Sequence, residues 1–168
     1  DIRKNAAAGV EQVSAHADEQ HLDEHSHRLV ERLKQQRYRA QRVRRHDIPK
    51  GDGTPRPLGI PAVEDKRRQR AVARRLAAID AQDFRRCRDG YRPPVGALEA
   101  VETLTIKLPC GRYAWVVEAD ITTFFDTIDQ NGMVRMCAER IDDGALRRLI
   151  QQGLKAGGLG TDGQVLHP

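Results

Sequence analysis

The chain has 168 residues, of which 39% are hydrophobic and 32% charged, and its mean hydropathy is −0.66. This balance describes a polar chain with material for one domain core, and it excludes a disulfide-rich scaffold. No stretch has the apolar length of a membrane span and no basic-plus-apolar signal opens the chain, so we expect no membrane association and a cytoplasmic location.

Charge is distributed unevenly along the chain. Residues 28–92 contain twenty Lys or Arg against eight Asp or Glu, whereas the remaining residues contain nine against sixteen. Arg outnumbers Lys in this basic block, which suits phosphate recognition because the guanidinium group binds phosphate bidentately. The alternative interpretation is a solvated helix surface.

Neither cysteine nor histidine spacing specifies a metal site. Cys87, Cys110 and Cys137 are widely spaced, which fits reduced thiols better than bridges. His21 and His25 are one helical turn apart and could share a metal, but the His-Glu-x-x-His pattern is absent and the alternative is a solvated helix face.

The basic block begins with a predicted helix and a predicted hairpin. Apolar residues recur at helical spacing over residues 17–37. Two short extended runs then flank Lys50-Gly51-Asp52-Gly53-Thr54, and Asp-Gly between such runs predicts a β-hairpin. Prolines in both runs restrict them to edge positions or incompletely paired backbone.

A second helix is predicted after Pro61, with Asp65 near its N-terminal cap. It turns Val72, Leu76 and Ile79 inward and presents a cationic outer face. The arginines expected on that face are Arg67, Arg68, Arg70, Arg74 and Arg75. Residues 90–94 break the chain before a third helix over residues 97–108.

An apolar run then leads into a carboxylate. Residues 114–117 predict a buried strand, from which Asp120 emerges as either a paired structural acid or a metal ligand. Two short helices follow Asp129, and residues 160–168 predict a turn and the start of a strand. The fold class is α+β, with an incomplete sheet because the strand at 113–120 has no partner in the sequence, which points to a fragment.

Three clusters converge on one reaction class. A carboxylate at a strand end binds hard cations such as Mg²⁺, and a hairpin bearing Lys50 and Arg56 can close over a triphosphate. An arginine-rich helix can follow a nucleic-acid backbone. Together they indicate nucleotidyl transfer.

Three segments, residues 43–61, 90–93 and 117–129, closely resemble the reverse transcriptases encoded by bacterial group II introns. The resemblance implies the fingers-palm portion of a right-hand polymerase. Residues 1–112 would form a fingers-like region with an N-terminal extension, and residues 113–168 a partial palm. The implied function is RNA-directed DNA polymerisation in intron splicing and mobility, with intron or template RNA, a DNA primer and deoxynucleoside triphosphates as partners.

The resemblance also implies roles for individual residues. Asp120 matches the first metal-binding aspartate, and the backbone carbonyl of Ile121 would assist it in holding Mg²⁺. Phe125 matches the steric gate that excludes a ribose 2′-hydroxyl. Lys50 and Arg56 match residues that contact the incoming triphosphate.

Contacts to template or RNA are implied for a larger set. These residues are Arg44, Arg45, Arg67, Arg68, Arg74, Arg75, Tyr91 and Arg92. Alternatives stay open for several of them: Arg44 and Arg45 could face solvent, and Tyr91 could stack on a base or pack internally. Asp126 and Asp129 are interpreted as turn and cap acids.

The sequence also departs from the family pattern. Pro94-Val95 stands where a Gly and a polar residue are usual, and the sequence contains no Tyr-x-Asp-Asp turn, which supplies the other catalytic carboxylate. We therefore expect these 168 residues to be catalytically silent by themselves. Two alternatives are a truncated RNA-binding remnant without enzymatic role and a product that does not fold stably.

Overall fold

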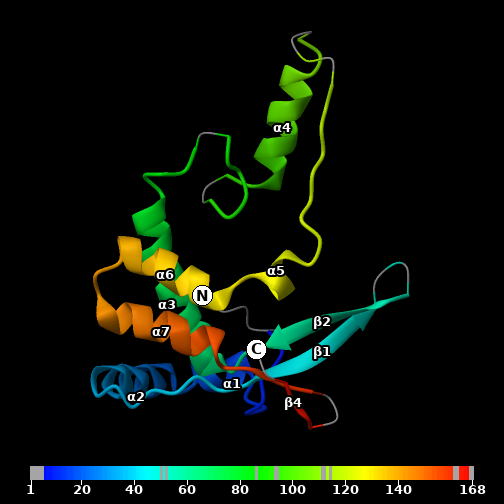
Figure 1. The fold of residues 1–168 in the computed structure, drawn as a ribbon. Coiled ribbons are helices and arrows are strands. Elements are labelled where there is room, and N and C mark those ends of the chain that lie inside the picture. The colour runs from blue at the N-terminus through cyan, green and yellow to red at the C-terminus, as the bar shows by residue number, and fades with distance from the viewer. Residues whose placement is uncertain are drawn as a thin grey trace. The chain divides into compact units, whose positions relative to one another are not determined.

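The computed structural model describes residues 6–49, 51, 53–85, 87–92, 95–110, 113, 115–160 and 163–166. Over these residues the fold is mixed α+β, as expected, with a small four-stranded sheet (Figure 1). The helices are α1 (Ala15–Glu19), α2 (Leu22–Lys34), α3 (Val63–Asp80), α4 (Ala97–Lys107), α5 (Phe124–Thr127), α6 (Gln130–Arg140) and α7 (Gly144–Leu154). The strands are β1 (Val43–Pro49), β2 (Pro55–Ile60), β3 (Gly158–Leu159) and β4 (Val165–Leu166).

The chain divides into two compact units, and each is described by itself. The first comprises residues 1–72 and 129–168, and the second comprises residues 73–128. The sequence-based division into residues 1–112 and 113–168 stays a prediction. Among the described residues, no helix is both long enough and apolar enough to cross a membrane.

The predicted hairpin is confirmed and forms one side of the sheet in the first unit, with its second strand at the edge. Strands β1 and β2 pair antiparallel from Arg44 opposite Ile60 to Pro49 opposite Pro55. Strand β1 also pairs in parallel with β3, which pairs antiparallel with β4, so the strand order is β2-β1-β3-β4. The predicted strand in the C-terminal tail is therefore present as β4.

Local capping explains several helix boundaries. The helix expected over residues 17–37 is two helices, because His21 adopts a non-helical conformation between α1 and α2. Asp129 caps α6 by accepting a hydrogen bond from the Asn131 N–H, and Asp143 caps α7 by accepting from the N–H groups of Ala145 and Leu146. The interpretation of Asp129 as a cap acid is confirmed. The side chain of Asp126 lies outside the described part of the structure.

The predicted strand at residues 113–120 is wrong. Residues 113 and 115–121 have no regular secondary structure, and the described residues among them are exposed. A strand is stable only where its backbone N–H and C=O groups find partners. None of the four described strands pairs with this segment.

The interior of the first unit is organised around the carboxylate of Asp65, which is 2% exposed. The hydroxyl of Tyr38 donates a hydrogen bond to one Asp65 oxygen, and the Gln41 N–H donates to the other at 3.0 Å. Nε of Arg68 lies 3.6 Å from Asp65 Oδ1, and the Arg68 guanidinium packs over the Tyr38 ring. Burial and the hydrogen bond to Asp65 raise the pKa of Tyr38, so Tyr38 stays neutral and can donate.

The expectation that Arg67 and Arg68 face outward is wrong. Arg68 is 4% exposed, and its Nη1 donates a hydrogen bond to the Leu149 carbonyl of α7 at 2.7 Å. The Arg67 side chain is 16% exposed and pairs with Asp18, and burial lowers the pKa of Arg67. Each guanidinium group is directed inward because it has an oxygen partner in another segment, the Asp18 carboxylate for Arg67 and the Leu149 carbonyl for Arg68.

The N-terminal segment closes the start of α3. Glu11 Oε1 accepts a hydrogen bond from the Val63 N–H at 2.9 Å, so Glu11 rather than Asp65 satisfies the first turn of the helix. Nζ of Lys66 donates to the Ala7 carbonyl at 2.5 Å. Asp65 is thereby available for the buried cluster.

Replacing Tyr38 by Phe should destabilise the fold. The substitution removes one donor to the Asp65 carboxylate and leaves that buried group under-satisfied, which costs about 1–3 kcal/mol. Urea unfolding followed by circular dichroism would measure the loss. The matched control is Tyr91→Phe, because Tyr91 is 89% exposed. Loss of its hydroxyl should change the free energy of unfolding by less than about 0.5 kcal/mol. Equal effects of the two substitutions would contradict the buried role of Tyr38.

Candidate nucleic-acid interface

The hairpin presents one predicted triphosphate contact at an open surface. Arg56 lies on β2 opposite Ile48, and its side chain is exposed. With Ile48, Pro49, Gly51 and Leu58 it lines a shallow hollow near the turn. Lys50, the other predicted triphosphate contact, lies outside the described residues. The hairpin therefore combines an exposed guanidinium with an apolar surface.

Two arginines at the start of the hairpin have different surroundings. Arg45 is half-buried, and its Nε donates to Asp47 Oδ1 at 2.9 Å. Arg44 is half-buried as well, and its Nε is buried without a hydrogen-bond partner among the described residues. Arg45 therefore has an internal counter-ion, whereas the Nε donor of Arg44 is unsatisfied within the described structure.

The cationic face predicted for α3 exists, but with fewer members. Arg70, Arg74 and Arg75 are exposed, whereas Arg67 and Arg68 are withdrawn into the interior. Exposed guanidinium groups at helical spacing can follow a phosphate backbone. The exposed arginines of α3 thus begin at Arg70, about one helical turn after Arg67, where the sequence predicted them to begin.

Tyr91 is presented to solvent in a turn. The residue is 89% exposed and its backbone has a positive φ of 55°. Internal packing of this ring, one of the two alternatives from the sequence, is therefore excluded. Arg92 is half-buried and its Nη1 donates to the Arg85 carbonyl at 3.1 Å, so this arginine supports the local chain.

The segment that contains Asp120 is exposed throughout its described residues. Trp115 is 89% exposed, Val117 90% and Phe125 77%. The ring of Phe125 contacts that of Phe124 edge-on, with centroids 5.3 Å apart. Asp120 itself is exposed and has no regular secondary structure around it. Asp120 and Phe125 belong to the second unit, whereas Arg56 belongs to the first.

The donors at Asp120 match Mg²⁺ in kind. Asp120 and the backbone carbonyl of Ile121 offer hard oxygen ligands, which Mg²⁺ prefers. Among the residues that the structure describes, no group of three or more His, Cys, Asp or Glu could hold a metal ion. This donor set fits an ion that takes its other ligands from water and substrate phosphates.

His25 is one of the two histidines whose spacing raised the question of a shared metal. Its side chain interacts with the carboxylate of Asp18, and the distance between His25 Nδ1 and Asp18 Oδ1 is 2.6 Å.

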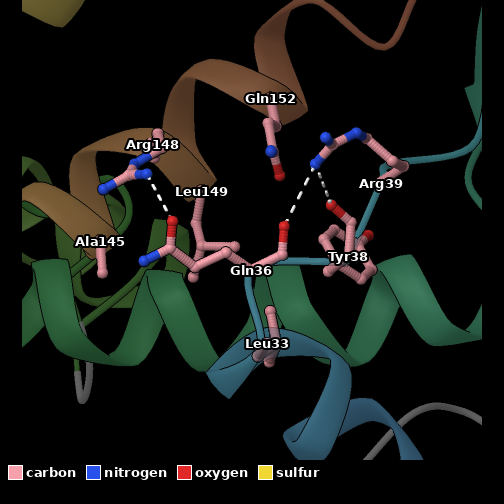
Figure 2. A pocket seen from close by; sticks show the side chains of 8 residues that line it. All are labelled: Leu33, Gln36, Tyr38, Arg39, Ala145, Arg148, Leu149 and Gln152. Carbon is pink, nitrogen blue, oxygen red and sulfur yellow. Dashed lines mark hydrogen bonds between the residues drawn. The ribbon is translucent and has the colours of Figure 1, made fainter.

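Sequence reasoning missed a pocket in the first unit, shown in Figure 2. It lies between residues 33–39, at the end of α2, and helix α7, and it has a volume of about 280 Å³. Arg39 and Arg148 contribute guanidinium groups, and Gln36 and Gln152 contribute amides. One signal was available in the sequence, since Tyr38, flanked by Arg37 and Arg39, is the single Phe, Trp or Tyr before Phe84.

Comparison with curated proteins relates the chain to intron-encoded proteins. It is 37% identical over 131 residues to the group II intron-encoded protein LtrA of Lactococcus lactis, a match that covers 77% of this chain and 22% of LtrA. The chain belongs to the family of group II intron-encoded proteins. The expected resemblance is thereby confirmed.

Two further relatives match a similar share of the chain. Protein YkfC of Escherichia coli is 36% identical over 118 residues, which cover 68% of this chain and 31% of YkfC. The putative COX1/OXI3 intron 2 protein of Saccharomyces cerevisiae is 31% identical over 119 residues, which cover 68% of this chain and 13% of that protein. A search against protein-family models gave no match. The chain spans about a third or less of the length of these curated relatives.

The exposure of residues 115–121 can be tested by fluorescence, because Trp115 is the single tryptophan of the chain. This residue is 89% exposed, so we expect the emission maximum of a solvated indole. Acrylamide should quench it nearly as efficiently as it quenches free N-acetyltryptophanamide. A blue-shifted emission with strong protection from acrylamide would instead indicate a buried segment.

Proposed function

We propose that this chain supplies part of an RNA-directed DNA polymerase of the group II intron type, which performs template-directed nucleotidyl transfer with Mg²⁺. The observation that carries the proposal is membership of the group II intron-encoded family, with 37% identity over 77% of the chain. In the complete protein, this activity would serve intron splicing and mobility. Its partners would be intron or template RNA, a DNA primer and deoxynucleoside triphosphates.

The fold is proposed to be the fingers and first palm portion of a right-hand polymerase. The confirmed hairpin supports this assignment, because it places Arg56 beside an open hollow. A triphosphate in that hollow would lie within reach of the Arg56 guanidinium group. Arg56 and Lys50 would neutralise the triphosphate of the incoming nucleotide. The exposed ring of Phe125 would act as the steric gate against a ribose 2′-hydroxyl.

Asp120 is proposed as a catalytic metal ligand. Its carboxylate and the Ile121 carbonyl would hold Mg²⁺, which would neutralise charge on the transferring phosphate. Exposure of Asp120 supports the proposal, since an accessible carboxylate can share an ion with substrate. Two-metal transfer needs additional carboxylates, so catalysis is proposed to require ligands beyond Asp120.

A second candidate function is RNA binding without catalysis. It is favoured by the exposed arginines Arg70, Arg74 and Arg75 on α3 and by a net charge of +5. The exposed ring of Tyr91 would add base stacking. This function needs no metal and would survive the loss of Asp120.

Binding of a deoxynucleotide tests the polymerase proposal. Titration of the chain with dATP and Mg²⁺ in a calorimeter should show binding that Arg56→Gln weakens about tenfold or more, because the substitution removes a charge-assisted hydrogen bond. The matched control is Arg45→Gln on the same hairpin, since Arg45 already pairs with Asp47. No dATP binding, or equal losses in both variants, would count against a triphosphate site at Arg56.

RNA affinity tests the second candidate. Replacing Arg70, Arg74 and Arg75 by Gln should make binding to a single-stranded oligoribonucleotide less sensitive to salt. The slope of log K against log salt concentration should become shallower by about 0.7 for each phosphate that the variant no longer neutralises. Fluorescence anisotropy at several salt concentrations would measure the slope. The control neutralises Arg28, Lys34 and Arg135, each of which lies near a carboxylate and should contribute little. Asp120→Ala should leave this affinity unchanged, and equal slopes for the two triple variants would rule out α3 as the RNA-binding surface.

A further inference from the structure

We propose that the pocket between residues 33–39 and α7 binds one unpaired nucleotide of RNA. The inference rests on the proposed binding of RNA by this chain and assigns a specific site to it. In Figure 2 the side chains of residues 36 and 39 approach from one wall, and those of residues 148 and 152 approach from α7. The pocket therefore lies between two segments of the same compact unit.

The walls of the pocket combine an apolar surface with cations. Leu33, Ala145 and Leu149 supply the apolar part. Arg39 and Arg148 supply two guanidinium groups, and no Asp or Glu lines the pocket among the described residues. Because no carboxylate of that lining compensates these cations, the pocket favours a ligand that carries an anion beside a flat apolar body. A nucleotide has both parts.

The two guanidinium groups are positioned by hydrogen bonds that leave donors for a ligand. Nη1 of Arg148 donates to Gln36 Oε1 at 2.7 Å. Nη1 of Arg39 donates to the carbonyls of Tyr38 and Gln36, at 3.0 and 3.4 Å. A guanidinium has five N–H donors, and these hydrogen bonds engage one nitrogen of each group. The remaining donors can bind phosphate oxygens, and the guanidinium planes can stack on a base.

Gln152 supplies an independent indication of a ligand. Its side-chain oxygen Oε1 is buried and has no hydrogen-bond partner among the described residues. Figure 2 shows this side chain extending from α7 toward Gln36 and Arg39. A buried acceptor without a donor is costly. An exocyclic amine or ring N–H of a nucleobase would supply the missing hydrogen.

The pocket is preformed by the buried cluster behind it. Tyr38, which lines the pocket, is 2% exposed and donates to Asp65. The Leu149 carbonyl on the opposite wall accepts from Arg68 at 2.7 Å. Because Arg68 also pairs with Asp65, both walls are tied to one carboxylate. Little ordering is then needed when a ligand binds.

Nuclear magnetic resonance of the isotopically labelled chain tests the proposal. AMP should shift the side-chain amide signals of Gln36 and Gln152 and the backbone signals of α7. Adenosine lacks the phosphate and ribose 5-phosphate lacks the base, so each should bind at least about fivefold more weakly than AMP. Equal affinity for AMP and ribose 5-phosphate would reduce the pocket to an anion site and overturn the proposal, as would the absence of shifts at these residues.

A pair of neighbouring substitutions separates binding from folding. Gln152→Leu removes the buried acceptor and should lower AMP affinity about fivefold, without loss of stability in a thermal melt. Gln151→Leu, one residue earlier on α7 and outside the pocket lining, should leave AMP affinity unchanged. Unchanged affinity in Gln152→Leu would overturn the assignment of the base-binding residue.

Oligoribonucleotide binding and AMP binding, both measured on the wild-type chain and on Gln152→Leu, test the proposed function and the pocket separately. If the wild-type chain binds an oligoribonucleotide with salt sensitivity but does not bind AMP in this pocket, the pocket assignment alone fails. If the wild-type chain binds no RNA at all, both the proposed RNA binding and the pocket assignment fail. Binding of both, with the expected loss in Gln152→Leu, supports the two together.

Discussion

The carboxylate of Asp65 joins segments that are far apart in the sequence. It accepts from Tyr38, 27 residues earlier, and from the Gln41 N–H, and it lies beside Arg68, which reaches the Leu149 carbonyl 81 residues later. Breaking a buried charge pair is strongly destabilising because the remaining group loses its compensation. The loop after α2, helix α7 and the start of helix α3 are consequently held as one body. The hairpin and the nucleotide pocket both depend on that body.

Burial differs sharply between the two compact units. The first unit contains the buried residues, including Leu29, Tyr38, Ile60 and Val63, whereas none of the described residues of 73–128 is buried. Apolar side chains of α4, such as Leu98, are instead exposed. Cooperative stability follows buried surface, so we attribute it mainly to the first unit. Of the residues with a proposed role, Arg56 belongs to the first unit and Asp120 to the second.

Arginines that look equivalent in the basic block have separate physical roles. Nη1 of Arg32 donates to both carboxylate oxygens of Glu64, at 2.7 and 2.9 Å, and Arg67 and Arg68 are directed inward. Arg74 and its exposed neighbours on α3 remain available to an anionic partner. The internally paired arginines support the fold, whereas the exposed ones carry the electrostatic field that RNA would meet. Net charge alone therefore overstates the size of the binding surface.

Local patterns in the sequence determined the family, the α+β class, the hairpin and the helices after Asp129. Asp-Gly turn chemistry and helix capping act over a few residues, so the sequence contains nearly all the information that they need. Tertiary structure decided the rest. Whether the apolar run at 113–120 becomes a strand depends on partners elsewhere, and the described strands supply none. The direction of Arg68 and the pocket beside Gln152 depend on contacts between distant segments, such as the hydrogen bond from Arg68 to the Leu149 carbonyl of α7, which local periodicity does not encode.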